Sequence, residues 1–206
     1  MRRTAAATVL LCCCLALAAC GSRRGEPPKL DVTAPPAKAA AYTSPSGDVS
    51  FSYPENWAVQ PRAAPGVVTV STGGASATIW AYRSVSLVAD PKAAQQALQR
   101  FLASLKTRDP NFVVSSTAVT TVFQRPAFEV QGTTVIQGRP TEARSVHAFI
   151  GVGEYVLDML ADPDKFDEIN RTVFSPMLVS WHFLGNPPSP DQAAGGSSSP
   201  TAPASP

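Results

Sequence analysis

One histidine and one aspartate could form a polar pair that moves protons. His147 lies in the alternating apolar and polar run 141–150, and Asp158 lies in the next such run, 154–161. A two-residue turn at Val152-Gly153 would join these runs as antiparallel strands and set His147 directly opposite Asp158. An imidazole beside a carboxylate can act as a general acid or base, and the same pair also serves as a structural hydrogen bond. The pair is therefore the candidate polar site of this chain.

Few residues are available for other common chemistries. The 206 residues include 2 histidines and 4 cysteines, with no H-E-x-x-H motif, no spaced cysteine pairs, no G-x-S-x-G elbow and no glycine-rich phosphate loop. The acidic run from Asp162 to Glu168 lacks the glycine of an EF-hand loop, and helix capping explains acids at the start of a helix. We therefore predict no metal and no cofactor. A formal net charge of +2 also argues against nucleic-acid binding.

The first twenty residues have the layout of an export signal. Arg2 and Arg3 precede the uncharged, mostly apolar stretch 4–19, which falls short of the roughly 20 residues that span a bilayer. The motif Leu17-Ala18-Ala19-Cys20 resembles the lipobox of bacterial lipoproteins. The resemblance implies that residues 1–19 are a lipoprotein signal peptide, that cleavage precedes Cys20, and that its thiol receives a diacylglyceryl group. The alternative is an ordinary signal peptide whose cleavage site happens to precede a cysteine.

Cleavage at that site would change the chemistry of the chain. The three consecutive cysteines 12–14 would leave with the signal, so Cys20 would be the one cysteine of the mature protein. Loss of Arg2 and Arg3 would leave 15 basic residues beside 15 acidic ones. The folded part would therefore have neither a disulfide nor a cysteine nucleophile. We expect the protein at the extracytoplasmic face of the cell membrane, anchored by the lipid on Cys20.

Two polar segments flank a single domain. Residues 20–42 are rich in proline and alanine without a sustained apolar period, which predicts a lipidated flexible tether. Residues 185–206 have no large apolar side chain and are predicted to be a disordered tail rich in serine, proline and alanine. Residues 43–184 remain, and a chain of this length can bury one good core.

The periodicity of residues 43–184 predicts an α+β domain. Apolar residues alternate with polar ones in several strand-like runs, and Gly73-Gly74 separates two of these runs as a hairpin would. A helix is predicted from Asp90-Pro91 to about Arg108, with Leu98 and Phe101 at the centre of its apolar face. A second helix is predicted from Asp162-Pro163, with a bend or restart at Pro176. The predicted strand runs are 49–53, 66–72, 76–85, 112–123, 127–137, 141–150 and 154–161.

Two short motifs connect the domain with a known family. The run Phe51-x-Tyr53-Pro54-x-x-Trp57 near its start is similar to the opening signature of PsbP-like domains. The run 180–183, Ser-Trp-His-Phe, fits the end of the C-terminal helix in that family, which includes secreted actinobacterial lipoproteins of the LpqN type. The resemblance implies an α/β/α sandwich with a mainly antiparallel sheet and a non-catalytic role in assembly or ligand binding. It carries over no catalytic residue.

Two functions from different classes follow from these features. The first is a membrane-anchored lipoprotein whose domain binds an envelope protein or a small apolar ligand without catalysis. The alternative is a cell-envelope hydrolase or transferase that uses His147 and Asp158; a purely structural envelope component is a third reading. A deep pocket beside His147 would favour the enzyme, whereas a fully satisfied polar pair on a convex surface would favour binding.

Overall fold

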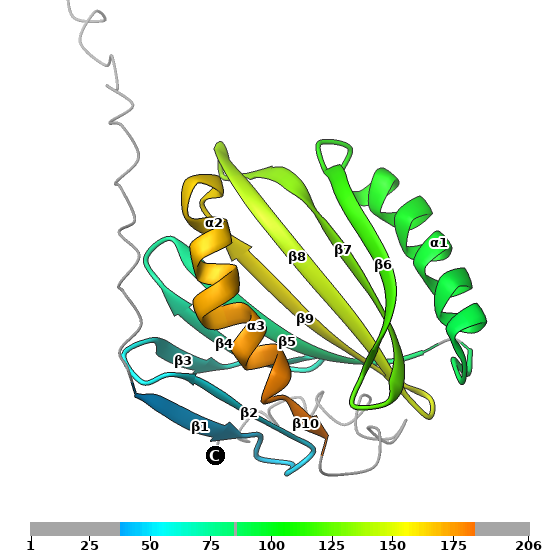
Figure 1. The fold of residues 1–206 in the computed structure, drawn as a ribbon, viewed down its shortest axis with the longest axis horizontal. Helices are drawn as coiled ribbons and strands as arrows, with labels where there is room; N and C mark the ends of the chain where they lie inside the picture. Colours follow the sequence, from blue (N-terminus) through cyan, green and yellow to red (C-terminus); the bar gives the residue numbers. More distant parts are fainter. Residues whose placement is uncertain (1–37, 85, 184–206) are drawn as a thin grey trace, which may run out of the picture.

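A computed structural model describes residues 38–84 and 86–183 of the chain. The predicted signal peptide, Cys20 and the tail 185–206 lie outside the described residues. Within the described ranges the chain forms a seven-stranded sheet with helices on both faces and a smaller three-stranded sheet beside it (Figure 1). In this part of the chain, no helix is long and apolar enough to cross a membrane.

Every strand pairing is antiparallel. The large sheet has the order β3-β4-β5-β9-β8-β7-β6, and the small sheet has the order β1-β2-β10. The hairpin predicted at Gly73-Gly74 joins β4 to β5, and β6 to β9 form the predicted meander. The strands are β1 (Ala39–Thr43), β2 (Val49–Pro54), β3 (Ala58–Pro61), β4 (Gly66–Thr72), β5 (Ala75–Arg83), β6 (Val113–Val122), β7 (Arg125–Ile136), β8 (Arg139–Ile150), β9 (Gly153–Ala161) and β10 (His182–Phe183).

Helix α1 (Pro91–Arg108) covers one face of the large sheet over β6 and β7. The Asp90 carboxylate accepts a hydrogen bond of 2.8 Å from the Ala93 backbone N–H, as its predicted capping role requires. Leu98 is buried in a cluster with Phe128 and Phe149 of the sheet, while Phe101 is half-buried at the edge of that cluster. The predicted apolar face of the helix is therefore the face that packs.

The opposite face of the sheet is covered by a helical segment in three parts, α2 (Pro163–Ile169), a π-helical turn (Asn170–Phe174) and α3 (Ser175–Val179). Proline has no backbone N–H and its ring crowds the carbonyl four residues earlier, so Pro176 cannot sit in an uninterrupted α-helix. The wider turn just before it accommodates this conflict, at the position where a bend was predicted. Helices on both faces make the domain the α/β/α sandwich that the resemblance to PsbP-like domains implied.

The structure corrects the start of the domain. Residues 39–42, predicted as the end of the tether, belong to β1, which pairs with β2 so that Tyr42 lies opposite Phe51. Their rings lie 5.2 Å apart between centroids, so the tyrosine anchors the strand to the core. The prediction failed because three alanines before Tyr42 carry no apolar alternation of their own. Strand β3, which also was not predicted, is short and mostly exposed.

Candidate functional site

A cavity of about 520 Å³ lies between α1 and the sheet. Side chains of β8 and β9 line its floor, and those of α1 line one wall, whereas α2 and α3 lie on the other side of the sheet. The volume is within the range of pockets that hold small ligands. The polar and charged residues of its lining include Tyr82, Arg108, Asp109, Ser145, His147, Glu154 and Asp158.

The structure corrects the predicted pairing of His147 with Asp158. The turn between β8 and β9 is Gly151-Val152, because Ile150 pairs with Gly153 and Gly151 takes the positive φ of 58° that such a turn requires. His147 therefore lies opposite Val156, and Asp158 lies opposite Ser145. The register differs from the predicted one by two residues, so both side chains remain on the same face of the sheet.

Four side chains form one hydrogen-bonded chain along the cavity floor. Ser145 donates to Asp158 with 2.6 Å between Oγ and Oδ1. The Nε2 atom of His147 lies 3.1 Å from the same Ser145 Oγ, and its Nδ1 lies 2.6 Å from Oε1 of Glu154. Asp158 and His147 are thus connected through Ser145, and the carboxylate that contacts the imidazole directly is Glu154. We call this chain of four residues the polar array.

The order Glu154, His147, Ser145 is that of a catalytic triad, but the hydrogen bonds do not activate the serine. Carboxylates that are ionised only accept hydrogen bonds, so the single proton of the Ser145 hydroxyl points to Asp158. The Nε2 atom of His147 is the more distant of the two neighbours of the Ser145 hydroxyl, at 3.1 Å against 2.6 Å for Asp158. Nucleophilic attack would require the serine proton to pass to the imidazole, and the hydrogen bond to Asp158 directs it elsewhere.

The backbone around Ser145 also lacks the donors that acyl transfer needs. Ser145 lies in the middle of β8 and pairs with Val130 of β7 on one side and Asp158 of β9 on the other. Backbone N–H groups in the interior of a sheet are used by the ladder, so they cannot form an oxyanion hole. The array is therefore suited to holding the cavity floor in one arrangement.

Aromatic rings fix His147 within the array. Its ring stacks on Phe128 with centroids 4.3 Å apart, and the Phe101 ring of α1 meets it edge-on at 4.5 Å. The side chain of His147 is only 5% exposed, and that of Glu154 is 24% exposed. Ligand access is therefore to Glu154 and the open end of the cavity, while the imidazole is enclosed between the sheet and α1.

Tyr82 and Arg108 lie at the rim of this cavity. Burial raises the pKa of Tyr82, the negative charges of Asp158 and Glu154 raise it further, and Arg108 lowers it. The tyrosine therefore keeps its proton at neutral pH and remains a hydrogen-bond donor. The Arg108 guanidinium lies 5.6 Å from the centre of the Phe101 ring. The rim offers two donors, while the floor offers two carboxylates.

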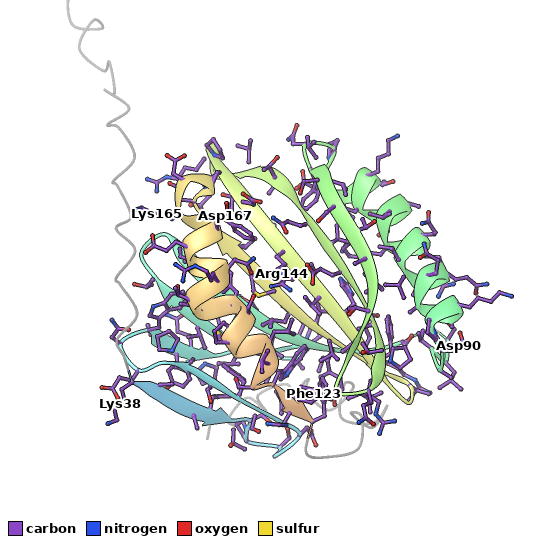
Figure 2. The ribbon with its side chains drawn as sticks, in the orientation of Figure 1. Lys38, Asp90, Phe123, Arg144, Lys165 and Asp167 are labelled. Carbon is purple, nitrogen blue, oxygen red and sulfur yellow. The ribbon has the colours of Figure 1, made fainter. Side chains whose placement is uncertain are left out.

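Other residues that the sequence singled out have structural roles. Trp57 is buried and meets Phe174 edge-on at 6.4 Å, and Tyr53 is half-buried beside Phe51. Lys165 and Asp167 of the acidic run lie on the exposed side of α2 (Figure 2). Among the described residues, no group of histidine, cysteine, aspartate and glutamate side chains could hold a metal ion.

Sequence reasoning missed Ser145 and Glu154 as members of the site. Alternate residues of a strand share a face, and each of these two lies an even number of residues from a side chain that faces the cavity. Ser145 lies two residues before His147, and Glu154 lies four residues before Asp158. The sequence signal that could have placed the turn correctly is Gly151 itself, because glycine readily takes the positive φ that the first position of a two-residue turn requires and that the structure shows there.

The fold and the cavity together define an α+β sandwich with a buried polar array under one helix. No family model matches the sequence, and no curated protein matches it. Solved structures do match. CyanoP, the PsbP of the cyanobacterium Synechocystis sp. PCC 6803, is 10% identical over 74% of this chain and 96% of its own, with a TM-score of 0.56.

Two further structures share the arrangement. LpqN of Mycobacterium tuberculosis, described as involved in cell envelope biogenesis, is 14% identical over 72% of this chain and 91% of its own, with a TM-score of 0.51. The Ran-binding protein Mog1p of Saccharomyces cerevisiae is 8% identical over 71% of this chain and 96% of its own, with a TM-score of 0.50. The described part of the chain therefore has a PsbP-like fold, as its two sequence motifs predicted.

Proposed function

We propose that this protein is an extracytoplasmic lipoprotein, anchored to the cell membrane through Cys20, whose domain binds a small ligand with an apolar part and does not catalyse a reaction. The cavity of about 520 Å³ lies beside His147, the position that was expected to favour an enzyme. The observation that carries the binding proposal is that the polar groups of its floor are hydrogen-bonded to one another. The wall supplies Phe101, Leu105 and Phe112 as apolar contacts.

The internal satisfaction of the polar array favours binding over turnover. The polar groups of the floor already have hydrogen-bond partners, so an apolar ligand that covers them leaves no donor or acceptor unpaired. The free-energy cost of desolvation on binding is therefore small. The rim donors Tyr82 and Arg108 and the open carboxylate of Glu154 would orient a polar end of the ligand. The alternative hydrolase or transferase would need the Ser145 proton on His147, which the hydrogen bond to Asp158 opposes.

The lipid anchor rests on the residues around Cys20. The lipobox-like motif at the end of an uncharged stretch supports cleavage and lipidation. LpqN, which shares the fold, is described as involved in cell envelope biogenesis, and this agrees with an envelope location. The Ran-binding Mog1p shows that the same fold serves protein recognition, so a protein partner is the competing form of the binding function.

A pocket-filling variant tests the ligand. Ser104 lines the cavity but is exposed rather than part of the core, so Ser104→Phe should fill the space without disturbing the core, and Ser104→Ala is the matched control. We expect native mass spectrometry of the full chain, extracted from membranes in mild detergent, to show a bound small molecule in the unsubstituted protein and in Ser104→Ala but not in Ser104→Phe. A protein captured equally by both variants would favour the protein partner instead.

The anchor has its own test. Intact mass of the membrane-extracted protein should show cleavage before Cys20 and the added mass of the acyl chains, and Cys20→Ala should release the protein from the membrane fraction. An unmodified thiol on Cys20 would contradict the lipoprotein assignment and leave the ligand-binding proposal untouched.

A further inference from the structure

Strand β6 is a long, uncharged edge of the large sheet. Among the described residues it is the last strand in the order and pairs only with β7, so its outer row of backbone N–H and C=O groups faces away from the sheet. Its ten residues, VVSSTAVTTV, contain no charge and no proline, and most of them are exposed. Valine and threonine favour extended backbone, which makes the strand a template for pairing with another strand.

The other sheet edges in the described ranges are protected in ways that β6 is not. Strand β3 is four residues long and ends at Pro61, which cannot donate to a ladder. Strand β1 has five residues and follows the charged Lys38, and β10 has only two residues. Natural proteins prevent edge strands from pairing with other chains by short length, charge and proline. A ten-residue edge without these features is therefore expected to pair with a partner strand.

We propose that β6 pairs with β6 of a second copy of this chain, antiparallel and across a two-fold axis. Charge favours this partner. A strand with no charged residue along its length meets no like-charge repulsion from its own copy, and it offers none of the charge contrast that selects a different protein. The pairing joins two seven-stranded sheets into one continuous sheet. This inference is independent of the proposed ligand.

The geometry limits the region that pairs. A register shift between Val114 and Ser116 marks a bulge, which bends a strand and interrupts regular pairing at that end. The regular part of the edge therefore runs from Ser116 to Val122, with Val119 at its centre. A two-fold axis perpendicular to the sheet leaves each face of the sheet on its own side, so two residues that lie directly opposite each other must have side chains on the same face. In an antiparallel pair related by this axis, one residue therefore lies directly opposite the same residue of the second copy.

A lysine next to the centre of the edge tests the pairing. Ala118 is exposed and lies opposite Glu129 within the sheet, so Ala118→Lys gains an acidic neighbour in its own chain but brings two like charges together across the axis. Thr133→Lys is the matched control, because Thr133 is exposed on the interior strand β7 and lies opposite Glu142.

Sedimentation of the full mature chain carrying Cys20→Ser should show a concentration-dependent dimer. We expect Ala118→Lys to weaken association at least tenfold and Thr133→Lys to leave it unchanged. Single cysteines placed in turn at residues 116–121 should form a disulfide-linked dimer most readily at the position on the axis, where opposite Cα atoms lie roughly 4.5–5.5 Å apart.

Three results would overturn the proposal. The first is a chain that stays monomeric up to about 1 mM. The second is a dimer that Ala118→Lys and Thr133→Lys weaken equally or not at all. The third is a β6 edge that pairs with an extended segment of another protein, seen as loss of that partner in Ala118→Lys while the chain itself remains monomeric.

Discussion

Ser145 donates its hydroxyl proton to Asp158, with 2.6 Å between Oγ and Oδ1, although His147 Nε2 lies 3.1 Å from the same oxygen. A serine nucleophile must transfer its proton to the imidazole, and here the hydroxyl donates its hydrogen bond to a carboxylate instead. We therefore expect a fluorophosphonate probe to leave Ser145 unmodified, as measured by intact mass after long incubation. A single adduct that disappears in Ser145→Ala would contradict this and restore the hydrolase interpretation.

Packing of α1 on the sheet depends on Leu98. This side chain is 2% exposed and lies in the cluster with Phe128 and Phe149. Leu98→Ala removes buried methyl groups and leaves a cavity, which should lower the free energy of unfolding by about 3 kcal/mol. The exposed Gln99 on the same helix is the control, and Gln99→Ala should change stability by less than about 0.5 kcal/mol in denaturant melts. Equal effects of the two substitutions would contradict this packing.

Arg144 of β8, labelled in Figure 2, joins the helical segment to the sheet through hydrogen bonds and forms a shielded ion pair with Glu129 of β7. Its guanidinium lies 2.8 Å from Glu129 and donates to Asn170 and Ser175, while the two side chains of the pair are 13% and 22% exposed. Arg144→Met leaves Glu129 shielded without its cation, and we expect a loss of about 2–3 kcal/mol in urea unfolding together with faster hydrogen exchange in α2 and α3.

The matched control for Arg144 is the exposed pair of Lys38 and Glu55. Its ends are 3.5 Å apart and its side chains are 81% and 47% exposed, so Lys38→Met should change stability by less than about 0.5 kcal/mol. If Arg144→Met were as mild as Lys38→Met, the contacts of Arg144 would not be what fixes the helical segment.

The sequence predicted the elements whose signals are local. Asp90-Pro91 marked the start of α1, because the aspartate side chain caps the helix and the proline has no backbone N–H that would need a partner there. Gly73-Gly74 marked a hairpin. Alternation on β8 and β9 also placed His147 and Asp158 on one face. That result survived the error in register because a shift of two residues preserves the face of every side chain.

The parts that could not be predicted depend on tertiary contacts. Both Phe123 and Gln124 have positive φ, at 50° and 59°, in the turn between β6 and β7, where asparagine and glycine are the usual residues. The Phe123 ring lies 4.9 Å from His182 of β10, so a contact from far along the chain holds a turn that the local residues disfavour. Likewise, Glu154 joined the site because the register brought it diagonally to His147.

Tyr155 should make the stability of the domain fall at alkaline pH. Burial raises the pKa of its phenol from 10.0 to about 12, and the nearby charge of Asp48 adds to the shift. The folded pKa is raised, so the contribution of this group is complete below pH 10, where both states are protonated, and is lost as pH rises towards 12 because the unfolded chain ionises first. By pH 12 the loss should reach roughly 2 kcal/mol.

Chemical denaturation at a series of pH values measures this contribution. Tyr155→Phe should flatten the decline in unfolding free energy between pH 10 and 12, whatever its effect at neutral pH. Tyr82→Phe is the comparison, because the pKa of Tyr82 is also raised but the residue is 38% exposed, so this substitution should flatten the decline less than Tyr155→Phe does. A Tyr155→Phe protein with the same alkaline decline as the unsubstituted chain would show that this phenol is accessible to solvent, against its buried position beside Phe183 at 4.7 Å between ring centroids.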